Sequence, residues 1–201
     1  MTPEERLARM DELASRLHKG QARQDGTPAL VHARRVQTIL SSALTQSGEC
    51  RDPDALSALL CGAIGHDLLE DTAAAKEEIA EASGHAALSY IESLTNTFGD
   101  DHPDAYTRQV SENGEEVRLI KLSDLIDNLS QASISIGSLG TEWMQSYFLP
   151  IVDPMISGIE GTSFEAYAKT GTTLLSTVRI MRSHLSRSIE AYGQEPWGAA
   201  H

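Results

Sequence analysis

Apolar residues recur every three or four positions along most of the chain and predict a series of α-helices. The sequence shows no strand-like alternation, internal repeat or low-complexity segment. The predicted helices run approximately over residues 3–20, 28–43, 53–67, 73–82, 86–97, 105–111, 114–132, 142–159 and 164–192. This pattern predicts an all-α fold.

Capping residues and turn formers indicate where these helices begin and end. Thr2 and Glu5 form a capping-box pattern, and Asp52 precedes a proline in the position of an N-cap. The polar residues 21–27 are expected to form a loop, and the Ser- and Gly-rich residues 133–140 are expected to form a second one.

The stretch 66–72, His-Asp-Leu-Leu-Glu-Asp-Thr, concentrates chemically active side chains at the end of an apolar helix. If this stretch stays helical, His66 shares a face with Glu70, and Asp67 shares one with Asp71, because positions i and i+4 are neighbours on a helix. Four groups that can hold a metal ion or move a proton would then converge.

The predicted helix 114–132 carries two distinct faces. Its apolar face consists of Leu119, Leu122, Ile126 and Leu129. A polar stripe at spacings of three and four consists of Lys121, Asp124, Asn128 and Gln131. Such a stripe either faces water or supplies side chains to a site.

His32 lies on the apolar face of its predicted helix and should therefore point inward. A single inward histidine is more often a hydrogen-bonded core residue than a ligand. Combined with His66, Asp67 and Asp124, however, it gives two imidazoles and two carboxylates, a set that suits a divalent transition metal with open water positions. Manganese, iron, cobalt, nickel and zinc all fit such a set.

A metal ion held in this way could activate water for attack on a phosphoryl group. Glu70 and Asp71 would then be the acid and base groups beside it. The alternative for this pair is that Asp71 or Thr72 merely caps the next helix, which leaves Glu70 unexplained.

Composition limits the class of partner. With 201 residues and 40% hydrophobic content, residues 1–201 are expected to form a single domain. The formal charge of −13 argues against a nucleic-acid partner and favours a small molecule or a cation. The first 20 residues are charged and no run of eighteen apolar residues occurs, so we expect no membrane contact and a cytoplasmic location. The two cysteines, Cys50 and Cys61, are too few for a disulfide framework.

Four segments carry a resemblance to a known family. In order and spacing, the segments 18–23, 31–32, 66–72 and 121–128 resemble the HD-domain hydrolases of the RelA/SpoT family, and particularly the small alarmone hydrolases. The resemblance covers about residues 13–132. Residues 133–201 show none, and their predicted helices have no assigned role.

The resemblance implies an HD-type helical bundle and a set of residue roles. Glu70 and Asp71 would carry out the proton and water chemistry, and Arg23 and Asn128 would contact the base and sugar of a nucleotide. The family reaction removes the 3′-diphosphate from ppGpp or pppGpp and yields GDP or GTP and pyrophosphate. A single ion, Mn²⁺ in such enzymes, would be held by His32, His66, Asp67 and Asp124.

The chain departs from the family at three positions near these residues. Gln24 and Leu125 stand where the family usually has a cation, and Asp127 stands where it usually has a histidine. Because substrate phosphates must be neutralised, other cations would have to compensate. The candidates are Lys19, Lys121, Arg34, Arg35 and Arg108. If the missing cation limits activity, Leu125→Arg is expected to increase it.

The sequence therefore predicts a metal-dependent phosphohydrolase with a small nucleotide substrate, ppGpp being the leading one. Lys121 is expected to bind substrate together with Arg23 and Asn128. Two alternatives remain open: a phosphatase of another small nucleotide, and a nucleotide-binding sensor without turnover. Retention of both Glu70 and Asp71 favours an enzyme. The sequence leaves the oligomeric state open.

Overall fold

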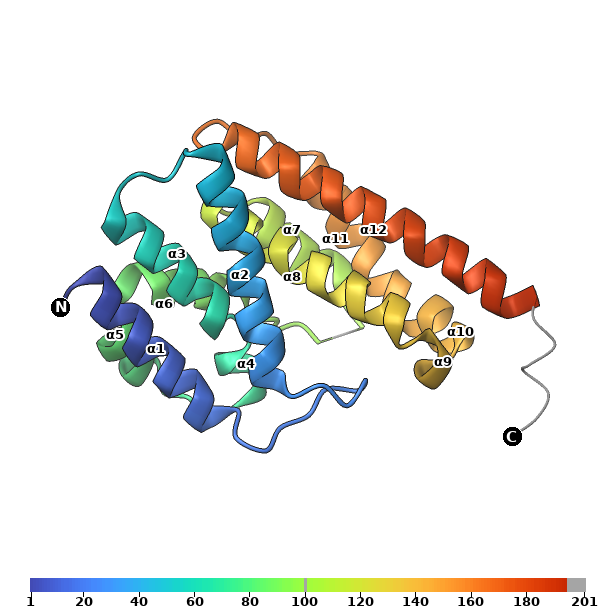
Figure 1. The fold of residues 1–201 in the computed structure, drawn as a ribbon, viewed down its shortest axis with the longest axis horizontal. Helices are drawn as coiled ribbons and strands as arrows, with labels where there is room; N and C mark the ends of the chain where they lie inside the picture. The colour runs from blue at the N-terminus through green and yellow to red at the C-terminus, as the bar shows by residue number, and fades with distance from the viewer. Residues whose placement is uncertain (100, 195–201) are drawn as a thin grey trace.

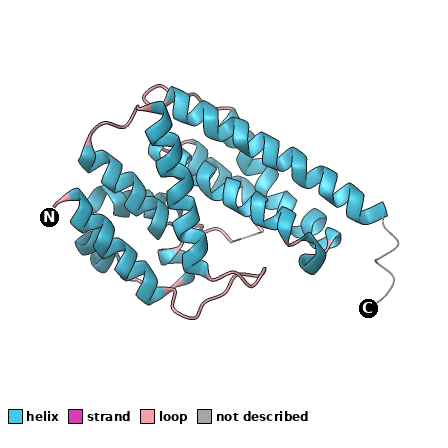
Figure 2. Cartoon of the chain, viewed as in Figure 1, coloured by secondary structure: helices cyan, strands magenta, loops and turns pink. Residues whose placement is uncertain are grey.

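The computed structural model describes residues 1–99 and 101–194, which form a bundle of helices (Figures 1 and 2). Within these ranges no strand forms, and Ala22 and Pro28 make an isolated β-bridge. The prediction of an all-α fold is confirmed. In chain order the helices are α1 (Pro3–Leu17), α2 (Ala29–Ser47), α3 (Pro53–Gly65), α4 (Leu68–Asp71), α5 (Lys76–Ser83), α6 (His85–Leu94), α7 (Pro103–Ser111), α8 (Glu115–Ile134), α9 (Ile136–Leu139), α10 (Thr141–Trp143), the π-helical η1 (Met144–Phe148), α11 (Leu149–Glu160) and α12 (Ala168–Gln194).

The N-terminal ends of α1 and α3 follow the predicted capping signals. Thr2 Oγ1 accepts the amide of Glu5 at 3.2 Å, and Glu5 Oε2 accepts the amide of Thr2 at 2.8 Å. This reciprocal pair satisfies amides that have no partner within the helix. At the start of α3, the side chain of Asp52 accepts the amide of Asp54 at 3.1 Å.

Small residues allow α3 to lie in close contact with its neighbours. A Cβ atom at Gly65 would lie 2.1 Å from Met10 Cε on α1, and one at Gly62 would lie 2.9 Å from Ile120 Cδ1 on α8. All nine residues from Ser57 to Gly65 are buried. The C-terminal end of α3 is therefore held firmly between other helices, and the stretch 66–72 begins there.

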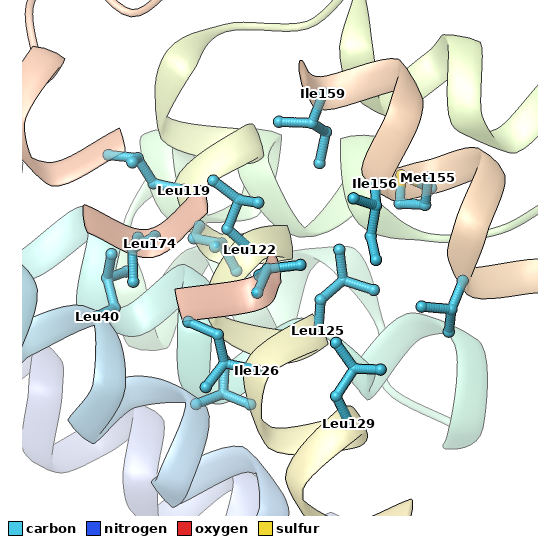
Figure 3. Close-up of a cluster of buried hydrophobic side chains, with 14 of the residues drawn as sticks. Leu40, Leu119, Leu122, Leu125, Ile126, Leu129, Met155, Ile156, Ile159 and Leu174 are labelled. Atoms are coloured by element: carbon cyan, nitrogen blue, oxygen red, sulfur yellow. The ribbon is translucent and has the colours of Figure 1, made fainter. Parts of the chain in front are cut away.

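Two apolar clusters stabilise the bundle. The smaller one joins α1, α3 and α6 through residues such as Met10, Ile64 and Ile91. The larger one surrounds α8, which contributes Leu119, Leu122, Leu125, Ile126 and Leu129 to a cluster completed by α2, α11 and α12 (Figure 3). In Figure 1, α12 runs alongside α8 for much of its length.

Two glutamates from distant segments hold the start of α12 against the bundle. The carboxylate of Glu115 accepts the amides of residues 165–167 at 2.7 to 3.2 Å. Glu49 accepts the amides of Lys169 and Thr170 at 2.8 and 2.9 Å. Anionic side chains are favoured at helix N-termini, so these contacts place α12 over α2 and α8.

The stretch 66–72 does not stay in one helix with the segment before it, and the predicted end of that helix at residues 66–67 lies close to the observed one. Helix α3 ends at Gly65, His66 and Asp67 form a turn, and α4 is a separate four-residue helix. His66 Nδ1 donates to the carbonyl of Ala63 at 2.8 Å and thereby takes the place of a helical amide. The amide of Asp71 still bonds to the carbonyl of Asp67 at 2.8 Å, so these two residues remain one turn apart.

Residues 133–160 also differ from the sequence prediction. The expected loop 133–140 is the end of α8 followed by α9, because Ser133 donates its hydroxyl to the helix and Ile136 is buried. The expected helix 142–159 is divided by η1, which ends two residues before Pro150. Proline has no amide hydrogen to continue the helical pattern.

Smaller differences concern helix ends in the first half of the chain. The predicted helices 73–82 and 86–97 run over 76–83 and 85–94 instead. The turn between them occurs at Gly84, as predicted, where φ is +89°. Of the predicted C-terminal region, residues 195–201 lie outside the described residues. None of the helices in the described ranges has the length and apolar character needed to cross a membrane.

Candidate metal centre

Side chains from α2, the end of α3 and α8 meet at one point in the interior. The Nε2 atoms of His32 and His66 lie 3.2 Å apart. Asp67 Oδ1 lies 3.1 Å from His66 Nε2, and Asp124 Oδ1 lies 3.2 Å from His32 Nε2. The two histidines are 1% and 4% exposed, and Asp124 is 3% exposed. The structure therefore brings together all four predicted metal ligands.

Hydrogen bonds at the far side of each imidazole assign its tautomer. His32 Nδ1 donates to Asp127 Oδ2 at 2.7 Å, and His66 Nδ1 donates to the carbonyl of Ala63 at 2.8 Å. In the neutral rings, both Nε2 atoms then carry lone pairs. Two lone pairs and two carboxylate oxygens face one another, and a cation satisfies all four.

The separations among these atoms fit a metal coordination shell. With metal–ligand bonds of about 2.1 Å, neighbouring ligands lie ~3.0 Å apart in an octahedron and ~3.4 Å apart in a tetrahedron. The observed separations run from 3.1 to 3.6 Å. The donor set is a candidate site for a divalent metal ion, and its nitrogen and oxygen atoms are of the types that such ions bind.

The electrostatics of the metal-free cluster show how strongly it attracts positive charge. Burial lowers the pKa of His32, but hydrogen bonds with Asp124, Asp127 and Asp67 outweigh burial and raise this pKa to about 9. Burial also lowers the pKa of His66. The negative charge of Asp67, together with the contacts of His66 with Asp124 and Asp67, outweighs burial and raises this pKa to about 10. A divalent cation would displace these protons and supply their charge.

Asp124 is held by two further side chains of α8. Its Oδ2 accepts Lys121 Nζ at 2.9 Å, and its Oδ1 accepts Asn128 Nδ2 at 2.8 Å. Lys121 also lies over the ring of Tyr106, 5.1 Å from its centroid. Burial opposes the charge of Lys121, yet the neighbouring Asp124 carboxylate raises the pKa of this ammonium. The polar stripe of α8 therefore faces the site and not water.

Glu70 and Asp71 lie on α4, directly after the turn formed by His66 and Asp67. Glu70 Oε2 accepts the amide of Asn96 at 2.8 Å, which ties α4 to the chain after α6. Both carboxyl groups are solvent-accessible. Even so, partial burial is the largest influence on each pKa, and it acts together with the charge of Asp67 to raise both pKa values.

The loop 21–28 supplies a further pair of side chains beside the site. Arg23 donates its amide to the carbonyl of Thr27 at 2.8 Å, which closes the loop on itself. Arg23 NH2 also donates to Asn128 Oδ1 at 2.5 Å. Gln21 Nε2 donates to the carbonyl of Asp71 at 2.9 Å, so the loop is joined to α4 as well. Arg23 and Asn128, both predicted to contact substrate, thus lie in direct contact.

A cavity of about 340 Å³ opens next to Arg23 and Asn128. Asp71 lies on its wall and connects it to α4. Its lining also includes Trp143 and Phe148, whose rings are stacked with their centroids 5.6 Å apart. These aromatic residues come from α10 and η1, in the region for which the sequence suggested no role.

Two of the three departures from the family pattern, Leu125 and Asp127, have other roles in the structure than the sequence suggested. Leu125 is 2% exposed and lies in the apolar cluster with Leu129 and Ile156 (Figure 3), so it does not face the site. This burial contradicts the reasoning behind Leu125→Arg, because the new cation would enter the core. Asp127 is 3% exposed and contacts His32, so it is part of the site. Gln24 lines the cavity.

Three of the candidate compensating cations are paired with carboxylates, and one of these pairs, Arg34 with Asp11, lies away from the site. Arg34 donates two hydrogen bonds to Asp11 on α1, at 2.7 and 2.8 Å. Arg35 donates two to Asp127, at 2.5 and 3.0 Å. Of the cations considered, Arg35 and Lys121 therefore act on the site through its carboxylates.

The helical bundle and its paired histidines and aspartates have the arrangement expected of an all-α HD-type fold. No family model matches the chain. Over 131 residues it is 30% identical to the guanosine-3′,5′-bis(diphosphate) 3′-pyrophosphohydrolase of Aquifex aeolicus (strain VF5), a match that covers 62% of this chain and 17% of the relative. Over 153 residues it is 24% identical to the enzyme of that name, MESH1, from Drosophila melanogaster, covering 73% of this chain and 80% of the relative.

A solved structure has the same fold. It belongs to a metazoan ortholog of SpoT that hydrolyses ppGpp, and it superposes with a TM-score of 0.67 at 20% identity, over 89% of this chain and 96% of the other. The chain spans less than a fifth of the Aquifex relative, at 17%, but most of the Drosophila one, at 80%. The resemblance to RelA/SpoT-type hydrolases is confirmed.

Proposed function

We propose that this protein is a divalent-metal-dependent phosphohydrolase that removes the 3′-diphosphate from ppGpp or pppGpp, giving GDP or GTP and pyrophosphate. The observation that carries the proposal is the convergence of His32, His66, Asp67 and Asp124 beside a cavity lined by Arg23 and Asn128. The choice of substrate is supported by the two relatives and by the ortholog of SpoT, whose names and title describe this activity.

The metal in this proposal is Mn²⁺, held by two imidazole nitrogens and two carboxylate oxygens. An ion bound there supplies Lewis-acid charge that stabilises a phosphoryl oxygen during cleavage. Lys121 and Asn128 keep Asp124 in position, and the carbonyl of Ala63 keeps His66 in its required tautomer.

Glu70 and Asp71 act on protons in the proposed reaction. The raised pKa of each carboxyl group brings it closer to neutral pH, where an acid or base catalyst is most effective. Asp71 lies on the wall of the cavity, and Glu70 is fixed by the amide of Asn96. These positions suit orientation of the attacking water and protonation of the leaving oxygen.

The cavity is proposed to hold the base and sugar of the nucleotide. Among the residues that line it, Arg23 and Asn128 offer hydrogen bonds, while Trp143 and Phe148 offer an apolar surface. A planar base suits a cavity with polar and aromatic lining of this kind. The metal ion and Arg23 would reverse the field of the acidic chain for an anionic substrate.

The proposal is tested by incubating purified protein with ppGpp and Mn²⁺ and identifying the products by phosphate position. We expect pyrophosphate and GDP in equal amounts, and none of either with excess chelator. Hydrolysis of another nucleotide but not ppGpp would support the alternative phosphatase. Metal binding without turnover of any nucleotide tested would contradict an enzymatic role and favour a sensor.

A further inference from the structure

Asp127 contacts the edge of the His32 ring that points away from the other three proposed ligands. Its Oδ2 accepts Nδ1–H of His32 at 2.7 Å, on the edge of the imidazole opposite Nε2. Asp124, one turn earlier on the same helix, lies 3.2 Å from Nε2 through its Oδ1. Consecutive turns of α8 therefore hold both edges of one imidazole ring.

Asp127 is in turn held by Arg35 on α2. Arg35 Nε donates to Asp127 Oδ1 at 2.5 Å, and NH2 donates to Oδ2 at 3.0 Å, a two-point contact of guanidinium and carboxylate. The side chain of Asp127 is 3% exposed, and that of Arg35 is 31% exposed. Three hydrogen bonds converge on this buried carboxylate, so it has little freedom to move away from His32.

We propose that Asp127 and Arg35 are positioning residues that hold His32 in the orientation and tautomer required for metal binding. Without an acceptor at Nδ1, the ring can place its proton on Nε2 and can rotate, and either change removes a ligand from the ion. Hydrogen-bond partners of metal-binding histidines commonly account for about 10- to 100-fold in metal affinity. The inference rests on the proposed metal site but does not depend on the substrate.

The chain offers a matched control for this contact. Arg34 is the residue next to Arg35 on α2 and also makes a two-point contact with an aspartate, Asp11 of α1. That aspartate contacts no predicted ligand in any recorded hydrogen bond or ion pair of the described residues. Arg34→Gln and Arg35→Gln therefore remove the same kind of interaction from the same helix, and only one of them is connected to His32.

The test is direct titration with Mn²⁺, in the absence of nucleotide, on the full chain and on variants shown to be folded by circular dichroism. We expect Asp127→Ala to weaken Mn²⁺ binding by about 10- to 100-fold and Arg35→Gln to weaken it by a smaller factor. Asp127→Asn keeps an oxygen acceptor for His32 and should retain part of the affinity. Arg34→Gln should bind Mn²⁺ as the unmodified protein does.

Pulsed electron paramagnetic resonance of bound Mn²⁺ adds a readout that general destabilisation would not change. Couplings to two imidazole nitrogens are expected in the unmodified protein, and to one in Asp127→Ala at saturating metal. Unchanged affinity and two nitrogen couplings in Asp127→Ala would overturn the inference while leaving the metal site intact. Failure of the unmodified protein to bind any divalent metal would instead overturn the proposed function.

Discussion

The substitution Glu70→Gln separates catalysis from metal binding. Glutamine keeps the side-chain oxygen that accepts the amide of Asn96, at 2.8 Å in the structure, so the connection between α4 and the following segment is preserved. It removes the negative charge and the ability to gain and lose a proton. Loss of a general acid or base typically costs about 10²- to 10⁴-fold in rate. At 1.36 kcal/mol per tenfold, this corresponds to about 2.7 to 5.4 kcal/mol in the activation barrier.

The same change should have little effect on the metal ion. Glu70 is exposed and is not among the four ligands, so its charge acts on the site through solvent. Exposed charges interact by about 0 to 1 kcal/mol, which limits the expected change in Mn²⁺ affinity to ~5-fold. The assay measures kcat and KM for pyrophosphate release from ppGpp, and titration with Mn²⁺ measures affinity. Glu77→Gln, the same chemical change at an exposed position on α5, is the control.

Full activity of Glu70→Gln would refute the acid-base role assigned to this residue. Equal losses of metal affinity and activity would refute it in another way, because Glu70 would then act through the ion. The raised pKa of Glu70 adds a further check, since the acidic or basic limb of the kcat profile that this residue controls should disappear in the variant.

Three other predictions concern the ligands and the packing around them. Asp124→Ala should abolish bound metal and turnover together, as measured by elemental analysis and product release, and persistence of the metal would argue against Asp124 as a ligand. Gly65→Ala places a Cβ 2.1 Å from Met10 Cε and should cost about 1 to 3 kcal/mol of unfolding free energy. This loss of stability corresponds to a decrease of about 2 to 12 °C in Tm. An unchanged Tm would show that the Met10 side chain moves aside at no cost. In chelator, the pKa values of His32 and His66 are about 9 and 10, above the ordinary histidine value of 6.5. Protonation of these two rings therefore stabilises the folded protein fully below pH 6.5, and this stabilisation is lost as the pH rises through 9 to 10. The urea midpoint of the chelated protein should therefore fall over that range. A rise would contradict the raised pKa values of the two histidines.

Short-range signals in the sequence predicted the parts of the fold that depend on them. The capping box at Thr2, the N-cap at Asp52 and the inward position of His32 all follow from local spacing, and all are confirmed. The sequence also predicted the end of a helix at residues 66–67, but the cause of this break was not predictable in the same way. It depends on the ring bonding to the carbonyl of Ala63, which competes with continuation of an otherwise favourable helix.

The position of Asp127 shows why part of the site was missed. In the sequence, Asp127 stands where the family has a histidine, and its negative charge by itself would oppose binding of an anionic substrate. In the structure its charge is balanced by Arg35, which is 92 residues away in the chain, and it bonds to His32, 95 residues away. The spacing of three from Asp124 did place both carboxylates on one face of the helix. Their partners, however, are fixed by how α2 and α8 pack.

The cavity wall formed by Trp143 and Phe148 depends on an irregular segment. Regular periodicity predicted a single helix over 142–159, whereas η1 changes the direction in which the side chains project. No spacing rule for an α-helix places these two rings in one stack, so the sequence could indicate the aromatic residues but not their common location.

The separation of the ligands along the chain has a consequence for how the protein matures. His66 follows His32 by 34 residues, whereas Asp124, which lies on α8, follows His32 by 92 residues. During synthesis the emerging chain holds two histidines and one aspartate long before the last ligand exists. The proposed coordination shell would therefore be complete only after α8 has docked. Loading of the ion would then mark the completion of long-range packing, and it would link distant parts of the chain much as a late covalent cross-link does.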